Sequence, residues 1–313
     1  MKRNRIIIWT IIAACILCTG LVYLLTSSGK PDGFLWKAPH YYMKYCVNIP
    51  HGDDAHRFYV NDGYTSPNAY IAHGGGIQKY VFNNSIEAAQ DSIQRGFRFI
   101  EFDLLVTSDG HLVGGHNWPQ LREMAHLPVT DEPLSMAEVE ALSRPGEFSP
   151  VTAKDICRLL ELNPDLTIVT DQITDYELLL REIPYPDRLI VEILGTRRWD
   201  VCMRYREAVK AGVRYPAMTV RNKPMIELAY DCNIPIIVFG DLYYFENQES
   251  ADVVKRLHDK GITILIFSQV NPPYWDTAEF VREHLGKSFS LIYTEHWGPK
   301  DLLPSDNTRT EHE

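Results

Sequence analysis

The stretch Tyr70-Ile-Ala-His-Gly-Gly-Gly76 decides the fold of this chain, together with Ile100-Glu-Phe-Asp103 and Gly114-Gly-His-Asn117. The three stretches gather two histidines, two carboxylates and a run of glycines. Residues 69–72 are mostly apolar, as expected for a short strand buried on both faces. The glycines that follow let the backbone turn sharply and approach a ligand closely. The pattern predicts a strand that ends in a functional loop.

A pair of carboxylates lies in the second predicted strand, residues 97–107. Glu101 and Asp103 are two residues apart, and side chains alternate along a strand, so both point to the same face. Two like charges side by side are costly unless a cation lies between them. Oxygen ligands favour Mg²⁺ or Ca²⁺. The turn Thr107-Ser-Asp-Gly110 then predicts a return strand that brings His116 beside the pair.

Strand-like and helix-like stretches alternate along the rest of the chain. Eight strands are predicted at residues 69–72, 97–107, 166–171, 188–194, 217–220, 234–239, 262–268 and 290–294. Helices are predicted between them at residues 83–95, 153–162, 174–183, 199–211, 250–260 and 277–285. This alternation indicates a parallel sheet, and eight units indicate a closed (β/α)8 TIM barrel over residues 69–300, with an irregular insertion near 117–151. The site of such a barrel lies at the carboxyl ends of its strands.

The order of these motifs resembles the glycerophosphodiester phosphodiesterase family, within the superfamily of phosphatidylinositol-specific phospholipases C. That family has a His-Arg-Gly strand end, a Glu-Asn-Thr helix start, Glu-x-Asp, Thr-x-Asp-Gly and a second histidine. The matching segments here are His73-Gly-Gly75, Asn83-Asn-Ser85, Glu101-Phe-Asp103, Thr107-Ser-Asp-Gly110 and His116-Asn117. Two positions depart from the pattern, because the family's phosphate-binding arginine is Gly74 here and the glutamate of Glu-Asn-Thr is Asn83.

The resemblance implies a phosphoric diester hydrolase with one divalent cation, Mg²⁺ or Ca²⁺, as its cofactor. Asp171 ends the third strand, where the family has a metal-binding glutamate, so Glu101, Asp103 and Asp171 are the expected metal ligands. A helix cap is the alternative role for Asp171, and the family's nearby lysine is absent. Histidine titrates near neutrality and suits proton transfer. His73 and His116 are therefore the expected acid and base.

Five further residues are weaker candidates for substrate binding: Glu192, Arg197, Arg221, His296 and Trp297. The glycine at the arginine position means that positive charge for the phosphate must come from elsewhere. Arg197 and Arg221 follow predicted strands toward the same rim, but for either one alone an ordinary surface position is the favoured interpretation. A buried Glu192 would need a partner, either the metal or an arginine. His296 and Trp297 follow the last strand and are expected at the mouth.

The first 30 residues predict a membrane anchor. Residues 1–5 form a basic flank, and residues 6–26 are an uncharged, mostly apolar run long enough to span a bilayer. The basic flank should stay in the cytoplasm. We therefore expect a single-pass protein of the inner (cytoplasmic) membrane whose carboxyl-terminal domain is periplasmic or extracellular. A cleaved signal peptide, or a lipoprotein modified at Cys15, is the alternative.

Composition limits the partners of the remaining chain. Residues 1–30 hold four of the 31 basic residues and no acidic one, so the remainder carries 27 basic and 41 acidic residues. This balance argues against nucleic acid and against tight docking on anionic lipid. The four later cysteines are too widely spaced for a zinc site. Residues 27–68 are expected to form a linker and a cover before the barrel, and residues 301–313 a polar tail.

These features predict the metal-dependent hydrolysis of a phosphodiester by a pair of histidines. The expected substrate is a glycerophosphodiester, or a phosphodiester within an envelope lipid or polymer. The alternative is a catalytically silent barrel that binds a phosphorylated glycan or lipid, which the lost arginine and lysine favour. Retention of both histidines and of three carboxylates favours the enzyme.

Overall fold

The computed structural model describes residues 34–50, 58, 66–239, 248–267, 282 and 289–298. They belong to two units, one ending at Asn48 and the other beginning at Ile49. The described part of the first unit contains helix α2, Phe34–Cys46. The anchor predicted at 6–26 lies outside the described residues. None of the described helices is long and apolar enough to cross a membrane.

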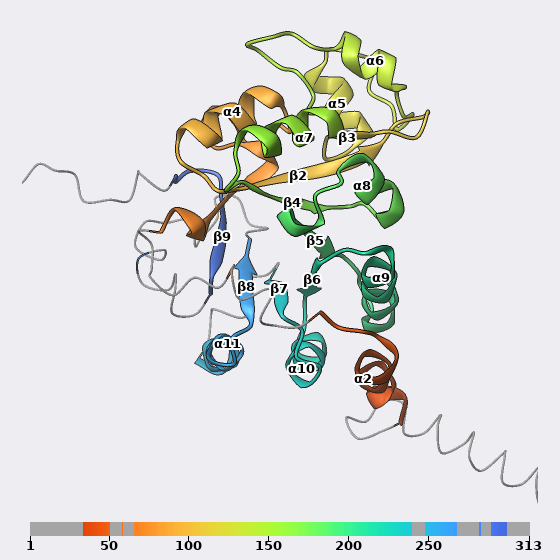
Figure 1. The fold of residues 1–313 in the computed structure, drawn as a ribbon, viewed down its shortest axis with the longest axis vertical. Coiled ribbons are helices and arrows are strands. Elements are labelled where there is room, and N and C mark those ends of the chain that lie inside the picture. Colours follow the sequence, from red (N-terminus) through yellow and green to blue (C-terminus); the bar gives the residue numbers. More distant parts are fainter. Residues whose placement is uncertain are drawn as a thin grey trace, which may run out of the picture. The chain divides into compact units, whose positions relative to one another are not determined.

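Eight parallel strands of the second unit close into a barrel (Figure 1). In chain order they are β1 (Tyr70–Ala72), β2 (Phe99–Val106), β4 (Thr167–Asp171), β5 (Leu189–Ile193), β6 (Tyr215–Val220), β7 (Ile236–Phe239), β8 (Thr263–Ile266) and β9 (Leu291–Thr294). Each strand pairs with the next, and β1 pairs with both β2 and β9, which closes the sheet. The register places Asp103 beside Asp171. The parallel barrel predicted from the alternating pattern is therefore confirmed.

A further strand, β3 (Leu112–Gly114), runs back antiparallel to β2, as predicted. The turn between them contains Gly110 with φ of +84°, a conformation that glycine adopts without steric cost. The N–H of Gly115 then donates to the carbonyl of Asp103 at 2.9 Å. The hairpin thereby carries His116 back to the carboxylate pair.

Helices surround the barrel between its strands (Figure 1). They are α4 (Ile86–Gln94), α7 (Ala153–Leu162), α8 (Tyr176–Glu182), α9 (Arg198–Ala211), α10 (Lys223–Asp231) and α11 (Gln248–Asp259). Single turns of 3-10 helix occupy Pro67–Ala69, His73–Gly75, Gln78–Tyr80 and Pro186–Arg188. The helix predicted at 277–285 lies outside the described residues except for Arg282.

The first barrel helix begins later than the sequence predicted. We expected a start at Asn83, but α4 starts at Ile86 because the hydroxyl of Ser85 accepts the N–H of Ala88 at 3.1 Å. A serine in this position satisfies one of the free N–H groups of the first turn. By contrast, α7 has its predicted bounds, fixed by a reciprocal cap between Thr152 and Asp155.

The segment near 117–151, predicted as an irregular insertion, is not irregular throughout. The segment contains α5 (Trp118–Met124) and α6 (Met136–Ala141). Pro119 lies in the first turn of α5, where a missing N–H breaks no helical hydrogen bond, so this proline does not exclude a helix. The two helices share a small buried core made of Val113, Trp118, Leu121, Leu134, Val139 and Phe148.

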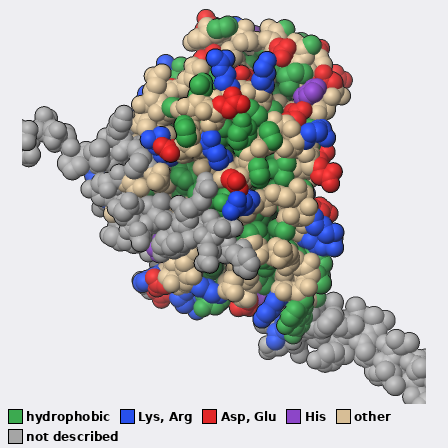
Figure 2. Space-filling model, viewed as in Figure 1, with side chains coloured by type: hydrophobic (Ala, Val, Ile, Leu, Met, Phe, Trp, Pro, Cys, Tyr) green, Lys and Arg blue, Asp and Glu red, His purple; other side chains and the backbone are tan. Residues whose placement is uncertain are grey.

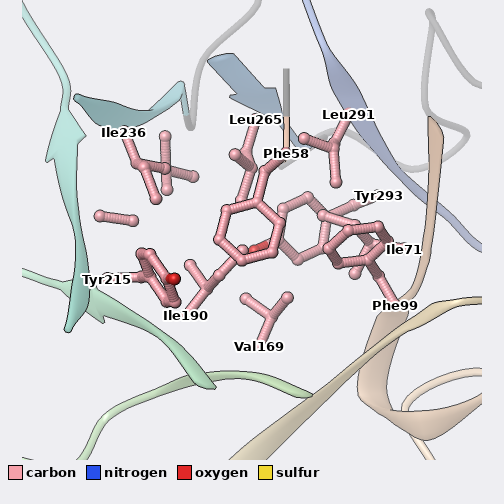
Figure 3. Packing of buried hydrophobic residues seen from close by; sticks show 12 residues of the cluster. Phe58, Ile71, Phe99, Val169, Ile190, Tyr215, Ile236, Leu265, Leu291 and Tyr293 are labelled. Atoms are coloured by element: carbon pink, nitrogen blue, oxygen red, sulfur yellow. The ribbon is translucent and has the colours of Figure 1, made fainter. Parts of the chain in front are cut away.

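The lower interior of the barrel is apolar (Figure 3). Inward side chains of successive strands pack there, with Phe58 among them at ring distances of 5.9 Å from Phe99 and 4.8 Å from Tyr215. Because side chains alternate along a strand, the inward position of Phe99 also turns Glu101 and Asp103 inward, higher on the same strand. The fold therefore sets polar groups above an apolar core.

Candidate active site

A cavity of about 710 Å³ lies at the carboxyl ends of the strands. Among the predicted site residues it collects His73, Glu101, Asp103, His116, Asp171, Glu192 and Arg221. The cavity is also lined by Phe82, Gln172, Leu194, Phe267, Tyr293 and Glu295. The site is thus formed by groups from both halves of the barrel.

Three carboxylates form one cluster in this cavity. Glu101, Asp103 and Asp171 each offer an oxygen atom, and these atoms lie within 4.8 Å of one another. Asp171 Oδ1 is buried and has no hydrogen-bond partner among the described residues. A buried acceptor without a partner is costly, and an all-oxygen donor set suits a hard divalent cation. The cluster therefore fits Mg²⁺ or Ca²⁺.

The pKa shifts within the cluster also favour a bound cation. Burial, and next the charge of Asp103, raise the pKa of Glu101 and of Asp171 well above the usual carboxyl range. The N–H of Gly74 donates to Glu101 Oε2 at 2.7 Å and opposes this rise only in part. Charged forms of these groups are thus disfavoured in the metal-free cavity, and a divalent cation would reverse that preference.

Of the three carboxylates, Asp103 is held by the most hydrogen bonds from described residues. Its Oδ2 accepts the Nδ2–H of Asn84 at 2.9 Å, and its own backbone N–H donates to Asn84 Oδ1 at 3.0 Å. Gln172 Nε2 donates to Oδ1 at 2.8 Å, and His116 Nδ1 lies 3.1 Å from the same oxygen. Although burial alone would raise it, the pKa of Asp103 is lowered by the hydrogen bonds from His116 and Asn84. In return, the hydrogen bond to Asp103 raises the pKa of His116.

His73 has a different carboxylate partner. Its Nδ1 lies 3.1 Å from Oε1 of Glu295, which directly follows β9. The ring also meets Phe82 and Tyr293 edge to face, at centroid distances of 4.4 and 5.5 Å. The N–H of Gln78 donates to the carbonyl of Glu295 at 2.7 Å and fixes that loop. Both histidines are therefore held through Nδ1 by a carboxylate.

Glu192 is buried on β5, and its partner differs from the two that were expected. The hydroxyl of Tyr293 donates to Glu192 Oε1 across the barrel. Burial raises the pKa of Glu192 to about 7, against the opposing effects of the Tyr293 hydrogen bond and the charge of Arg221. Arg221 follows β6 and is exposed on the cavity wall.

At position 74, where the family has an arginine, the backbone of Phe82 leaves no room for a side chain. Gly74 has φ of +55°, and a Cβ atom on it would lie 2.5 Å from the Cα of Phe82. Any side chain here would collide with backbone that cannot easily move. The replacement of arginine by glycine is therefore coupled to the approach of Phe82 to His73.

Three of the weaker candidates are not among the described lining residues of the cavity. Arg197 is exposed just before α9. His296 is exposed, and its carbonyl accepts a bond from Gln78 at 3.5 Å. The N–H of Trp297 donates to Thr294 Oγ1 at 2.9 Å. On this rim Glu295 and Tyr293 face the cavity instead.

Fold and site together define a β/α-barrel protein with two histidines beside a carboxylate cluster suited to a cation. Residues 73–182 match the model of the Glycerophosphoryl diester phosphodiesterase family. Over these residues the chain is similar to a family of phosphoric diester hydrolases. A comparison with curated proteins finds no match to this chain.

Solved structures share the fold at low sequence identity. A glycerophosphoryl diester phosphodiesterase of Parabacteroides distasonis is 17% identical, with a TM-score of 0.58 over 82% of this chain and 91% of that one. The Thermotoga maritima glycerophosphodiester phosphodiesterase is 16% identical, with a TM-score of 0.54 over 72% and 94%. A putative glycerophosphodiester phosphodiesterase of Galdieria sulphuraria is 15% identical, with a TM-score of 0.57 over 75% and 95%. These likenesses support the fold.

Proposed function

We propose that this chain hydrolyses a phosphodiester with one divalent cation and the pair His73 and His116. The observation that carries the proposal is that both histidine rings lie at the carboxylate cavity and that each is held there by a carboxylate. Each ring presents Nδ1 to a carboxylate oxygen at 3.1 Å, and neither Nε2 has a hydrogen-bond partner among the described residues. A neutral imidazole that donates through Nδ1 keeps the Nε2 lone pair free to accept a proton.

Glu101, Asp103 and Asp171 would hold the cation, Mg²⁺ or Ca²⁺. When bound, such a cation supplies positive charge to the phosphate oxygens and offsets the repulsion among its ligands. The unpartnered Oδ1 of Asp171 supports this assignment. The hydrogen bonds of Asn84 and Gln172 to Asp103 would hold that ligand in place.

The two histidines would divide the proton transfers of the reaction. One accepts a proton from the attacking water, and the other donates a proton to the departing alcohol oxygen. Arg221 would contact the phosphate, because it is the one lysine or arginine among the described lining residues and a guanidinium suits phosphate oxygens. In this arrangement Arg221 supplies the positive charge that the family's arginine would provide and that Gly74 cannot.

The substrate that we propose is a glycerophosphodiester, or a phosphodiester within an envelope lipid or polymer. This part of the proposal rests on the family match at residues 73–182. We also propose that the domain acts outside the cytoplasmic membrane, held there by residues 6–26. That location rests on the basic flank and the apolar run of the sequence.

Hydrolysis by the full chain, purified in detergent, tests the function. After chelation, Mg²⁺ or Ca²⁺ should restore cleavage of bis(p-nitrophenyl) phosphate and of glycerophosphodiesters. The variant with Glu101→Gln and Asp103→Asn should stay inactive with either ion. If the folded wild type cleaves no phosphodiester with any divalent cation, but binds a phosphorylated glycan or lipid, the barrel is a binding module.

A further inference from the structure

Helix α2 has one exposed face, which is aromatic and basic. Four exposed residues of this helix form it: Lys37, Tyr41, Lys44 and Tyr45. Their spacing of i, i+4, i+7 and i+8 places them on one side of a helix. Pro39 and Met43 lie on the opposite side and are buried. The helix therefore turns one side into the protein and holds its tyrosines and lysines outward.

The two tyrosines of this face are the most exposed aromatic residues in the described part of the chain. The relative exposure is 51% for Tyr41 and 72% for Tyr45. Their rings stack at a centroid distance of 6.3 Å with an interplanar angle of 16°. A tyrosine combines an apolar ring with a polar hydroxyl group, and such side chains are enriched where hydrocarbon meets water. The stacked pair therefore suits the headgroup layer of a bilayer.

The charge of α2 differs from that of the chain around it. The helix contains two lysines and no aspartate or glutamate, whereas the chain beyond residue 30 holds 41 acidic and 27 basic residues. Figure 2 shows acidic and basic side chains mixed over much of the visible surface. Lysine side chains can lie along apolar surface and place their ammonium groups beside lipid phosphates. The exposed face of α2 thus complements an anionic lipid surface.

The chain before α2 limits the distance between this helix and the membrane. The apolar run that is expected to cross the bilayer ends at residue 26, and α2 begins at Phe34. These eight residue steps span at most about 29 Å when fully extended. The helix itself has 13 residues and is about 20 Å long, and it is among the described helices that cannot cross a membrane. A position along the bilayer surface is therefore within its reach.

We infer that the face of α2 formed by Lys37, Tyr41, Lys44 and Tyr45 contacts the lipid headgroup layer of the membrane. The inference goes beyond the proposed hydrolysis and rests on the proposed location of residues 6–26. The partner is a bilayer surface that carries anionic lipid, because the rings suit the interface and the ammonium groups suit lipid phosphates. A second copy of the chain on this face would bring the same lysines together, and like charges repel.

Photo-crosslinking from tyrosine positions tests the contact in the full chain, reconstituted in vesicles of phosphatidylcholine and phosphatidylglycerol. The photoreactive residue p-benzoylphenylalanine replaces Tyr41 or Tyr45, one at a time. Tyr23 lies within the apolar run and is the positive control. Tyr230 on α10 and Glu123 on α5 are exposed in the second unit and are the negative controls. Mass spectrometry should identify lipid adducts at positions 23, 41 and 45, and none at 230 or 123.

The outcomes separate the inference from the proposals on which it rests. Lipid adducts at position 23 without adducts at 41 and 45 would refute the inference and leave the anchor in place. Crosslinks from 41 or 45 to a second copy or to another protein, in place of lipid, would also refute it, as would equal lipid adducts at 230 and 123. If no position yields a lipid adduct, the inference and the proposed location both fail. Cleavage of bis(p-nitrophenyl) phosphate by the same preparation would still uphold the proposed hydrolysis.

The charge of the lipid provides a second measurement. In vesicles of phosphatidylcholine alone, the initial yield of lipid adduct at position 45 should fall by about fivefold per lysine, the scale of one basic residue near an anionic surface. The variant with Lys37→Gln and Lys44→Gln should lose most of this difference between the two lipid compositions. Lys154→Gln, an exposed change on α7, is the matched control and should keep the difference. A double variant that also keeps it would refute the contact of these lysines with anionic headgroups.

Discussion

The two halves of the barrel differ in what they contribute to the cavity. Residues 73–182, which match the family model, supply the carboxylate cluster and both histidines. The second half supplies Glu192, Arg221, Phe267, Tyr293 and Glu295. The first half thus holds the groups proposed for the reaction, and the second holds groups that would orient them and select the substrate. The contrast teaches that matching motifs in one half do not determine what the whole cavity binds.

The largest expected effect lies in the first half. Changing His73 or His116 to alanine should lower turnover by about 10²–10⁴-fold, since each would transfer a proton in the transition state. Steady-state kinetics on a natural diester measures the loss. The double variant should lose little more than either single variant, because the two groups act as a unit. Additive losses would contradict a shared step.

A good leaving group sharpens this prediction. The departing p-nitrophenolate scarcely needs a proton, so the variant that lacks the acid should recover on bis(p-nitrophenyl) phosphate. The variant that lacks the base should remain inactive on both substrates. Recovery of both variants would assign the histidines to another role.

Arg221 tests the contribution of the second half. Arg221→Ala should lower kcat/KM by about 10- to 100-fold, the scale of a hydrogen bond to a charged group. Arg197→Ala is the matched control, because Arg197 is exposed and is not among the described lining residues. If the two variants behave alike, Arg221 does not contact the phosphate.

The lack of space at Gly74 predicts that adding a side chain there lowers the stability of the fold. Gly74→Ala should lower the free energy of unfolding by about 1–3 kcal/mol more than Gly110→Ala, through overpacking against the Phe82 backbone. Gly110 also has positive φ, but its Cβ would meet nothing within 4 Å. Chemical denaturation measures both. Equal losses would show that backbone conformation alone requires glycine at 74.

The carboxylate cluster predicts a smaller effect on the metal-free protein. A carboxyl whose pKa is raised on folding contributes stability below its ordinary range, and this is lost as the pH rises through the folded pKa. Because the pKa of Glu101 is raised, metal-free Glu101→Gln should melt higher than the wild type at pH 8, by about 2–4 °C per kcal/mol gained. The gain should vanish near pH 4. A lower melting temperature at pH 8 would contradict repulsion within the cluster, and Glu123→Gln should change nothing.

Much of the fold could be predicted from local pattern. The alternation of apolar strands and amphipathic helices indicated the closed barrel, and α7 has its predicted bounds. The alternation of side chains also placed Glu101 and Asp103 on one face. Local cap chemistry was harder to read, because Ser85 rather than Asn83 caps α4, and Asn117 caps α5 in a segment predicted to be irregular.

Long-range contacts in the site could not be predicted. Glu295 pairs with His73 across 222 residues of sequence, and no local pattern relates the two. Gln172 reaches Asp103 from a backbone with φ of +59°, which is uncommon for a non-glycine residue. Asn84 carried a usable signal, since it lies in the Asn83-Asn-Ser85 segment that matches a family motif.

Metal-dependent stabilisation tests the central claim most directly. The full chain should be stripped with a chelator and melted with rising Mg²⁺ or Ca²⁺, beside the variant carrying Glu101→Gln and Asp103→Asn. The wild type should gain stability by mass action, about 2.7 kcal/mol at a hundred times the dissociation constant. The variant should gain none. A variant that gains as much as the wild type would show that the cation binds elsewhere, and the account of this site would be wrong.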